Sequence, residues 1–210
     1  MDAELESMLD RADELIGNLE DEYKNCFQTK NVTNRAQNIT HEVLEKLRHA
    51  LDHAMRRVWD KHVSPHLSEE DRKRAHVYFP ITTGLGFFRS KLGEGRMSNL
   101  NKLHKELYDF VLKKQPFSSN ENKWLDLLTK IAAEGKHVKL APQKLIEIPR
   151  SKVSKPEVSS TSSEPFSVKF IKGERIWFTF VLDDYGVNAL GLCREISEKT
   201  RALIEEMDAF

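Results

Sequence analysis

The chain has 210 residues, of which 33 are basic and 33 acidic, so its formal net charge is zero. Its 39% hydrophobic and 31% charged residues are typical of a soluble, mostly helical protein. It contains no run of 18 apolar residues, so we expect no transmembrane helix. The acidic N-terminus lacks the apolar core of a secretion signal, and Cys26 and Cys193 lack a CxxC partner. We therefore expect a cytoplasmic protein without export, a disulfide scaffold or a cysteine zinc site.

The zero net charge conceals an asymmetry along the chain. Residues 1–22 hold nine acidic residues and one base, whereas residues 44–155 hold 23 bases and 13 acidic residues. A basic middle region can attract the phosphate backbone of a nucleic acid. It can equally consist of lysines and arginines that solvate the surfaces of helices. Charge alone leaves both interpretations open.

Two long amphipathic helices are predicted near the N-terminus. Within residues 3–30, apolar residues recur every three or four positions, at Leu5, Met8, Leu9, Ala12, Leu15, Ile16, Leu19, Tyr23, Cys26 and Phe27. Within residues 38–62, a second stripe comprises Ile39, Val43, Leu47, Ala50, Leu51, Ala54 and Val58. The short polar turn between the stripes predicts an antiparallel helical hairpin.

Shorter elements are predicted for the middle of the chain. Residues 76–81 are expected to be extended because Pro80 interrupts any helix, and residues 84–95 are expected to form one short helix. Further helices are expected to begin at serine caps. One carries apolar residues from Leu100 to Val111 and stops before Pro116, and another ends at Gly135. The expected caps are Ser68, Ser98 and either Ser118 or Ser119.

The pattern changes after residue 140. Residues 144–148 alternate weakly like a strand, and residues 151–165 are rich in serine and proline, which predicts a flexible loop. Residues 168–182 predict a β-hairpin, and residues 187–207 predict a final helix. We thus expect a mainly α protein with a helical bundle in residues 1–140. Residues 141–210 add a strand, the loop, the hairpin and the terminal helix, packed on the bundle.

One polar cluster in the second helix carries groups suited to catalysis. Arg48, His49, Asp52 and His53 avoid the apolar stripe, and His49 and His53 share one face. A histidine can transfer a proton near neutral pH, and a guanidinium can hold a phosphate. Attack of an RNA 2′-hydroxyl on the adjacent phosphate needs both groups and no metal. Asp52 could orient His53 or pair with Arg48.

The same residues also fit other roles. Arg48 and Asp52 are spaced as an ordinary ion pair along a helix, and the two histidines could lie on a solvated surface. His49 and His53 could also chelate a metal ion, although the sequence suggests no third ligand. Spacing alone does not choose among these interpretations.

Three segments, taken in order, give the chain a family resemblance. The residues from Arg48 to His53 match the R-x4–6-H pattern of HEPN ribonucleases, and LRHALDHA resembles the LRSALDH-type helix of small bacterial HEPN-like proteins. Residues 78–81 are similar to the FPI segment of those proteins. Leu127-Leu128, followed by Gly135-Lys136-His137, resembles their L-x-x-L…(D/N)KH segment.

The resemblance implies a HEPN-like antiparallel bundle that forms a homodimer around an RNA cleft, without a metal or cofactor. It implies a metal-independent endoribonuclease, acting in antiviral defence or as a toxin with an antitoxin or defence partner protein. Arg48, His53 and His49 would be catalytic, and Asp52, Lys136 and His137 auxiliary. Basic residues along the RNA path would be Lys46, Arg56 and Arg57. The alternative is a non-catalytic HEPN-like module that mediates dimerisation or binds a partner.

Overall fold

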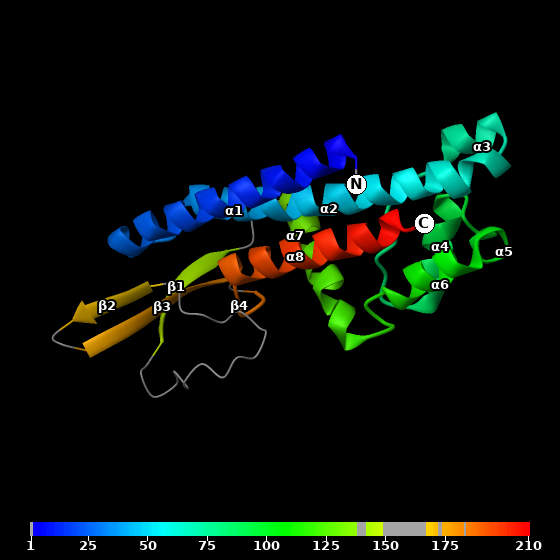
Figure 1. The fold of residues 1–210 in the computed structure, drawn as a ribbon. Helices are drawn as coiled ribbons and strands as arrows, with labels where there is room; N and C mark the ends of the chain where they lie inside the picture. The colour runs from blue at the N-terminus through cyan, green and yellow to red at the C-terminus, as the bar shows by residue number, and fades with distance from the viewer. Residues whose placement is uncertain (1, 138–141, 149–166, 172–173, 183) are drawn as a thin grey trace.

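The molecule is mainly helical and carries a small antiparallel sheet at one end (Figure 1). The computed structural model describes residues 2–137, 142–148, 167–171, 174–182 and 184–210. For residues 134–137, 147–148, 167–171 and 174–179 it describes the backbone alone. None of the helices in these ranges combines the length and the apolar character needed to cross a membrane.

Helices α1 (Ala3–Thr29) and α2 (Asn34–His62) form the predicted hairpin. They pack side by side along most of their length (Figure 1). The α2 helix begins four residues earlier than the apolar stripe indicates, because the Thr33 side chain accepts a hydrogen bond from the backbone N–H of Ala36 and caps the helix there. At the end of α1, Lys30 adopts a left-handed conformation that stops the helix.

The final helix, α8 (Ala189–Asp208), packs against both helices of the hairpin and completes a three-helix core. Its arginines bind the acidic face of α1. Arg201 contacts Glu6 and Asp13 at 3.2 and 3.0 Å, and Arg194 contacts Glu20 at 2.6 Å. Much of the acidic charge of the N-terminal segment is therefore balanced inside the bundle.

Short helices follow α2 in the chain. They are η1 (Ser64–His66), α3 (Glu69–Arg74), α4 (Leu85–Glu94), α5 (Leu100–Leu103), α6 (Lys105–Lys113), η2 (Asn120–Asn122) and α7 (Lys123–His137). Of these, α3 to α6 lie at the end of the molecule opposite the sheet (Figure 1). Ser68 caps α3, as the sequence predicts. Ser119 caps the short turn η2 that precedes α7, whereas the sequence predicts a serine cap on the α7 helix itself.

Two expectations for this region are wrong. The single helix expected to carry Leu100 to Val111 is divided into α5 and α6, because the His104 ring Nδ1 accepts a hydrogen bond from the Leu107 N–H and starts a new helix. Ser98 caps neither helix. The α7 helix also continues past Gly135, the residue expected to end it, as far as His137.

The sheet consists of β1 (Gln143–Ile148), β2 (Ser167–Ile171), β3 (Glu174–Leu182) and β4 (Val187–Asn188). The β3 strand lies between β1 and β2, all pairs are antiparallel, and β4 pairs with the end of β3. This confirms the predicted hairpin and the strand before it. Val187, expected in the final helix, belongs instead to β4. The predicted loop, residues 151–165, lies outside the described residues.

Aromatic stacking and buried hydrogen bonds join the sheet to the bundle. The Phe180 ring of β3 stacks on the Tyr23 ring of α1, with 3.9 Å between the ring centroids. The Tyr23 hydroxyl donates to the Gln143 side-chain carbonyl, and the Gln143 amide donates to the Thr40 hydroxyl at 3.0 Å. Burial raises the pKa of Tyr23, so the phenol stays a donor.

Candidate functional site

The Arg48 side chain is occupied by contacts inside the chain. Its Nη2 donates to the Asp52 carboxylate at 2.8 Å and to the Phe79 backbone carbonyl at 2.9 Å. The Arg48 and Asp52 side chains are only 16% and 18% exposed. Burial lowers the pKa of the Arg48 guanidinium, and the Asp52 carboxylate opposes that shift. The ordinary ion pair that the sequence left open is therefore present in this chain.

The Arg48–Asp52 pair binds a backbone segment that has no sheet partner. Residues 75–82 belong to no helix or strand. Asp52 accepts a hydrogen bond from the Phe79 N–H at 2.9 Å, so the pair satisfies both backbone polar groups of Phe79. Because Phe79 is fully buried, these groups would otherwise lack partners away from water.

Gln115 binds two further backbone groups of this segment. Its amide nitrogen donates to the Pro80 carbonyl at 2.6 Å, and its oxygen accepts from the Thr82 N–H at 3.2 Å. Gln115 is itself fully buried. Residues 79–82, which we call the clamped segment, are thus held between α2 and the end of α6. Sequence reasoning did not single out Gln115, because neither its spacing nor its neighbours distinguish it from a surface glutamine.

His53 lies apart from Arg48. Its Nε2 is 3.4 Å from the Glu4 carboxylate of α1, and its side chain is 28% exposed. Its Nδ1 is buried and has no hydrogen-bond partner among the described residues. Within one chain, the imidazole therefore faces the start of α1, whereas the guanidinium holds the clamped segment. The structure does not bring the expected catalytic pair together.

The remaining expected residues have different surroundings. His49 is exposed and Lys46 half-exposed on α2, and neither side chain has a partner among the described residues. Arg56 pairs with Asp60 at 3.1 Å, and Arg57 pairs with Asp2 and Asp208 at 2.8 and 3.0 Å. The two arginines expected along an RNA path are thus partly neutralised.

The structure gives less information on Lys136 and His137 and on the metal site that the sequence left open. Lys136 and His137 occupy the last turn of α7, but their side chains lie outside the described part of the structure. In that part, no group of three histidine, cysteine or acidic residues could hold a metal ion. The chelation alternative for His49 and His53 thus gains no third ligand from the described residues.

A second candidate surface lies in residues 72–117, which we call the basic lobe. This stretch holds ten lysines and arginines but only three acidic residues, Glu94, Glu106 and Asp109. Several of these bases form ion pairs, such as Lys91 with Glu94 at 2.8 Å. Four of them have no ion pair or side-chain hydrogen bond among the described residues: Arg72, Arg89, Lys102 and Lys113. The lobe therefore keeps an excess of free positive charge.

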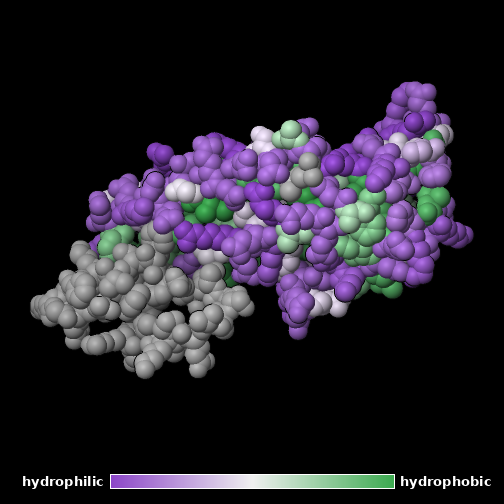
Figure 2. Space-filling model, in the orientation of Figure 1, coloured by the Kyte–Doolittle hydropathy of each residue, from purple (hydrophilic) through white to green (hydrophobic). Residues whose placement is uncertain are grey.

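Large hydrophobic side chains are exposed in the same stretch of chain. Figure 2 shows hydrophobic residues at the surface of the end of the molecule that holds α4 to α6. The exposed large hydrophobic residues of the described chain all fall between residues 78 and 117: Tyr78 (53% exposed), Leu85 (42%), Phe87 (69%), Leu103 (42%) and Phe117 (37%). Aromatic surfaces beside unpaired bases are suited to nucleic-acid binding.

The clamped segment positions these aromatic residues. Tyr78 directly precedes it, and Thr82 at its end bonds to the Gly84 carbonyl at the start of α4. On α4, Phe88 points inward, with its ring centroid 5.9 Å from that of Tyr108 and 6.5 Å from that of Phe117. Phe87, the residue before it on the helix, is exposed to solvent. The sequence predicted this helix but did not assign a role to Phe87.

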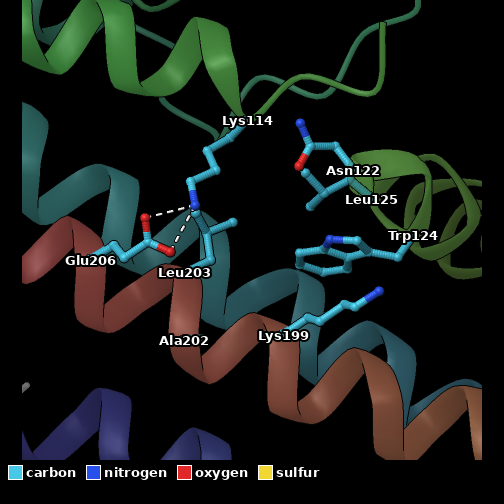
Figure 3. A pocket seen from close by; sticks show the side chains of 8 residues that line it. All are labelled: Lys114, Asn122, Trp124, Leu125, Lys199, Ala202, Leu203 and Glu206. Atoms are coloured by element: carbon cyan, nitrogen blue, oxygen red, sulfur yellow. Dashed lines mark hydrogen bonds and ion pairs between the residues drawn. The ribbon is translucent and has the colours of Figure 1, made fainter. Parts of the chain in front are cut away.

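The described surface includes two hollows whose linings do not contain Arg48, His49 or His53. The one in Figure 3 has a volume of about 150 Å³ and lies between the region of η2 and α7 and the helix α8. Its lysines are already paired, Lys114 with Glu206 at 2.7 Å and Lys199 with Glu195 at 2.6 Å. The second hollow lies in the basic lobe.

Comparison with known proteins adds no relative: no family model, curated protein or solved structure matches the chain. HEPN membership consequently stays a prediction from the sequence motifs.

The Arg48–Asp52 pair can be tested through the stability of the protein. Arg48→Ala should lower the free energy of unfolding by about 3 kcal/mol, because it leaves a half-buried carboxylate and the Phe79 carbonyl without their partner. The measurement is urea unfolding followed by circular dichroism. Arg56→Ala, which breaks an exposed pair with the same spacing on the same helix, is the matched control and should cost much less. Equal losses for the two variants would contradict a structural role for Arg48.

Proposed function

We propose that this chain is a HEPN-like helical module that binds single-stranded RNA on its basic lobe and does not cleave it. The observation that carries the proposal is the exposure of Tyr78 and Phe87 within a stretch that has seven more bases than acidic residues. Proteins that bind single strands combine positive charge along the phosphate backbone with aromatic rings on which bases stack. Both components are present in the basic lobe.

The arrangement of Arg48 and His53 supports binding without cleavage. Cleavage by a 2′-hydroxyl requires a proton-transfer group and a phosphate-binding group at the same phosphate. Arg48 is bonded to Asp52 and to the Phe79 carbonyl, and His53 faces Glu4. To bind a phosphate through Nη2, the guanidinium would have to give up the Asp52 carboxylate and the Phe79 carbonyl, and that buried carbonyl would lose its donor. The other terminal nitrogen, Nη1, has no hydrogen-bond partner among the described residues, but it is buried and so out of reach of a phosphate. We therefore assign Arg48 a structural role.

The endoribonuclease predicted from the R-x4–6-H pattern is the second candidate. It is favoured by one observation: His49 and His53, one turn apart on α2, both have access to solvent. Cleavage would need a second copy of the chain to supply a phosphate-binding group near these histidines. A role in defence or as a toxin, with an antitoxin or other partner protein, belongs to this candidate.

Stacking on the basic lobe predicts a specific loss of RNA affinity. Phe87→Leu keeps an apolar side chain but removes the aromatic face, so we expect the Kd for a short oligouridine to rise about 5- to 100-fold. Fluorescence anisotropy with labelled RNA measures the change, and the wild-type affinity should fall steeply as salt is raised.

The control for stacking is another exposed apolar residue of the same lobe. Leu103→Ala should leave the Kd for RNA almost unchanged, because leucine provides no stacking surface. If both variants bind RNA as the wild type does, or if the wild-type protein binds no RNA, the stacking proposal is wrong. If Leu103→Ala weakens binding as much as Phe87→Leu, the surface acts through general apolar contact instead.

The two candidates also differ in what happens to the RNA. The binding module should leave labelled single-stranded RNA intact in EDTA, with wild-type protein and with His53→Ala alike, as judged on a denaturing gel. RNA cut by the wild type and left intact by a folded His53→Ala variant would establish the endoribonuclease. A contaminating nuclease would also cut the RNA in a His53→Ala preparation purified in the same way, so that preparation is the control.

A further inference from the structure

A second hollow, of about 380 Å³, opens among α4, α5 and α6 in the basic lobe. Its lining comes from separate parts of the chain: Arg89 and Leu92 from α4, Ser98 from the turn after it, Asn101 from α5 and Tyr108 from α6. Leu92 is buried, whereas the polar residues reach solvent. The hollow is thus an open site with an apolar component and four polar side chains around it.

These four polar side chains are free to bind a ligand. Among the described residues, the side chains of Arg89, Ser98, Asn101 and Tyr108 form no hydrogen bond and no ion pair. None of the described residues that line the hollow is acidic. Nearby bases differ, since Lys91 binds Glu94 at 2.8 Å and Arg96 binds Asp71 at 3.5 Å. Arg89 therefore offers a guanidinium that no carboxylate neutralises.

We propose that this hollow binds a phosphate group of RNA, an inference that rests on the RNA-binding function proposed above. A guanidinium can hold two phosphate oxygens at once, and hydroxyl and amide groups can donate to the others. The volume lies within the range of small-ligand sites, so it accommodates a nucleotide rather than a bare ion. The hollow in Figure 3 lacks this capacity, because its two lysines already bind Glu195 and Glu206.

The test compares two arginines that both lack an acidic partner. Arg89→Gln removes the base in the hollow, and Arg72→Gln removes an exposed base of α3 that does not line it. With single-stranded RNA, Arg89→Gln should raise the Kd about tenfold or more, whereas Arg72→Gln should raise it only about two- to threefold by reducing the general positive charge. Arg89→Lys should not restore wild-type affinity, because lysine lacks the two-pronged geometry.

Two RNAs that differ at the 5′ end distinguish a terminal phosphate from an internal phosphodiester as the group that the hollow binds. If the hollow takes a terminal phosphate, 5′-phosphorylated oligouridine should bind more tightly than the 5′-hydroxyl form, and Arg89→Gln should abolish the difference. If it takes an internal phosphodiester, Arg89→Gln should weaken both RNAs equally. Either result supports the site. Equal effects of Arg89→Gln and Arg72→Gln on both RNAs would overturn it.

An NMR measurement distinguishes a failure of the proposed phosphate site from a failure of the proposed RNA-binding function. Uridine monophosphate added to isotope-labelled protein should shift the NMR signals of Ser98 and Asn101 in the wild type but not in Arg89→Gln. If the protein fails to bind RNA and these shifts are seen, the hollow is a nucleotide site and only the RNA-binding function is wrong. If RNA binds and the nucleotide shifts neither signal in the wild type, the hollow proposal is wrong and the function stands.

Discussion

The arrangement of this molecule depends on how one buried, extended stretch of backbone satisfies its hydrogen bonds. Phe79 to Thr82 run through the interior without a neighbouring strand, so their polar groups must find side chains or remain unsatisfied at a cost. Arg48 and Asp52 supply the partners from α2, and Gln115 supplies them from beyond α6. This requirement explains why a charged pair lies half-buried in the middle of a long helix. Arg48 and Asp52, which the sequence pattern singles out for catalysis, therefore serve to hold the fold.

The same constraint connects the helical bundle to the surface proposed for RNA. The clamped segment ends at Thr82, whose hydroxyl donates to the carbonyl of Gly84, the residue before α4. On that helix, Phe88 is buried and Phe87 is exposed. Charge is also distributed unevenly. Arginines of α8 neutralise much of the acidic charge of α1, whereas the basic lobe retains unpaired bases. A chain of zero net charge thereby presents a positive, aromatic surface at one end.

The parts of the fold that the sequence predicts are those set by local periodicity. The two long helices, the α4 helix and the β-hairpin follow from repeats that are visible within single segments. The division between α5 and α6 could not be read in this way, because it depends on the His104 ring replacing a backbone partner. The early start of α2 similarly depends on the Thr33 cap.

The candidate sites illustrate a different limit of sequence reasoning. Spacing allowed an Arg48–Asp52 pair and a catalytic Arg48–His53 pair equally, and only a distant residue distinguishes them. That residue, Phe79, lies 31 positions after Arg48 in the chain. The hollow around Arg89 is harder still to foresee, because its polar side chains come from three helices and a turn and share no period. Contacts that join distant segments are set by packing, and the pattern of one segment does not contain them.

Amide hydrogen exchange in the wild-type protein tests the central claim most directly. The N–H groups of Phe79 and Thr82 bind Asp52 and Gln115, whereas the adjacent Tyr78 N–H has no partner among the described residues. These hydrogen bonds predict slow exchange at Phe79 and Thr82 and fast exchange at Tyr78, within one stretch of five residues. Uniformly fast exchange across that stretch would show that the side chains of α2 and Gln115 do not hold it, and would free Arg48 for another role.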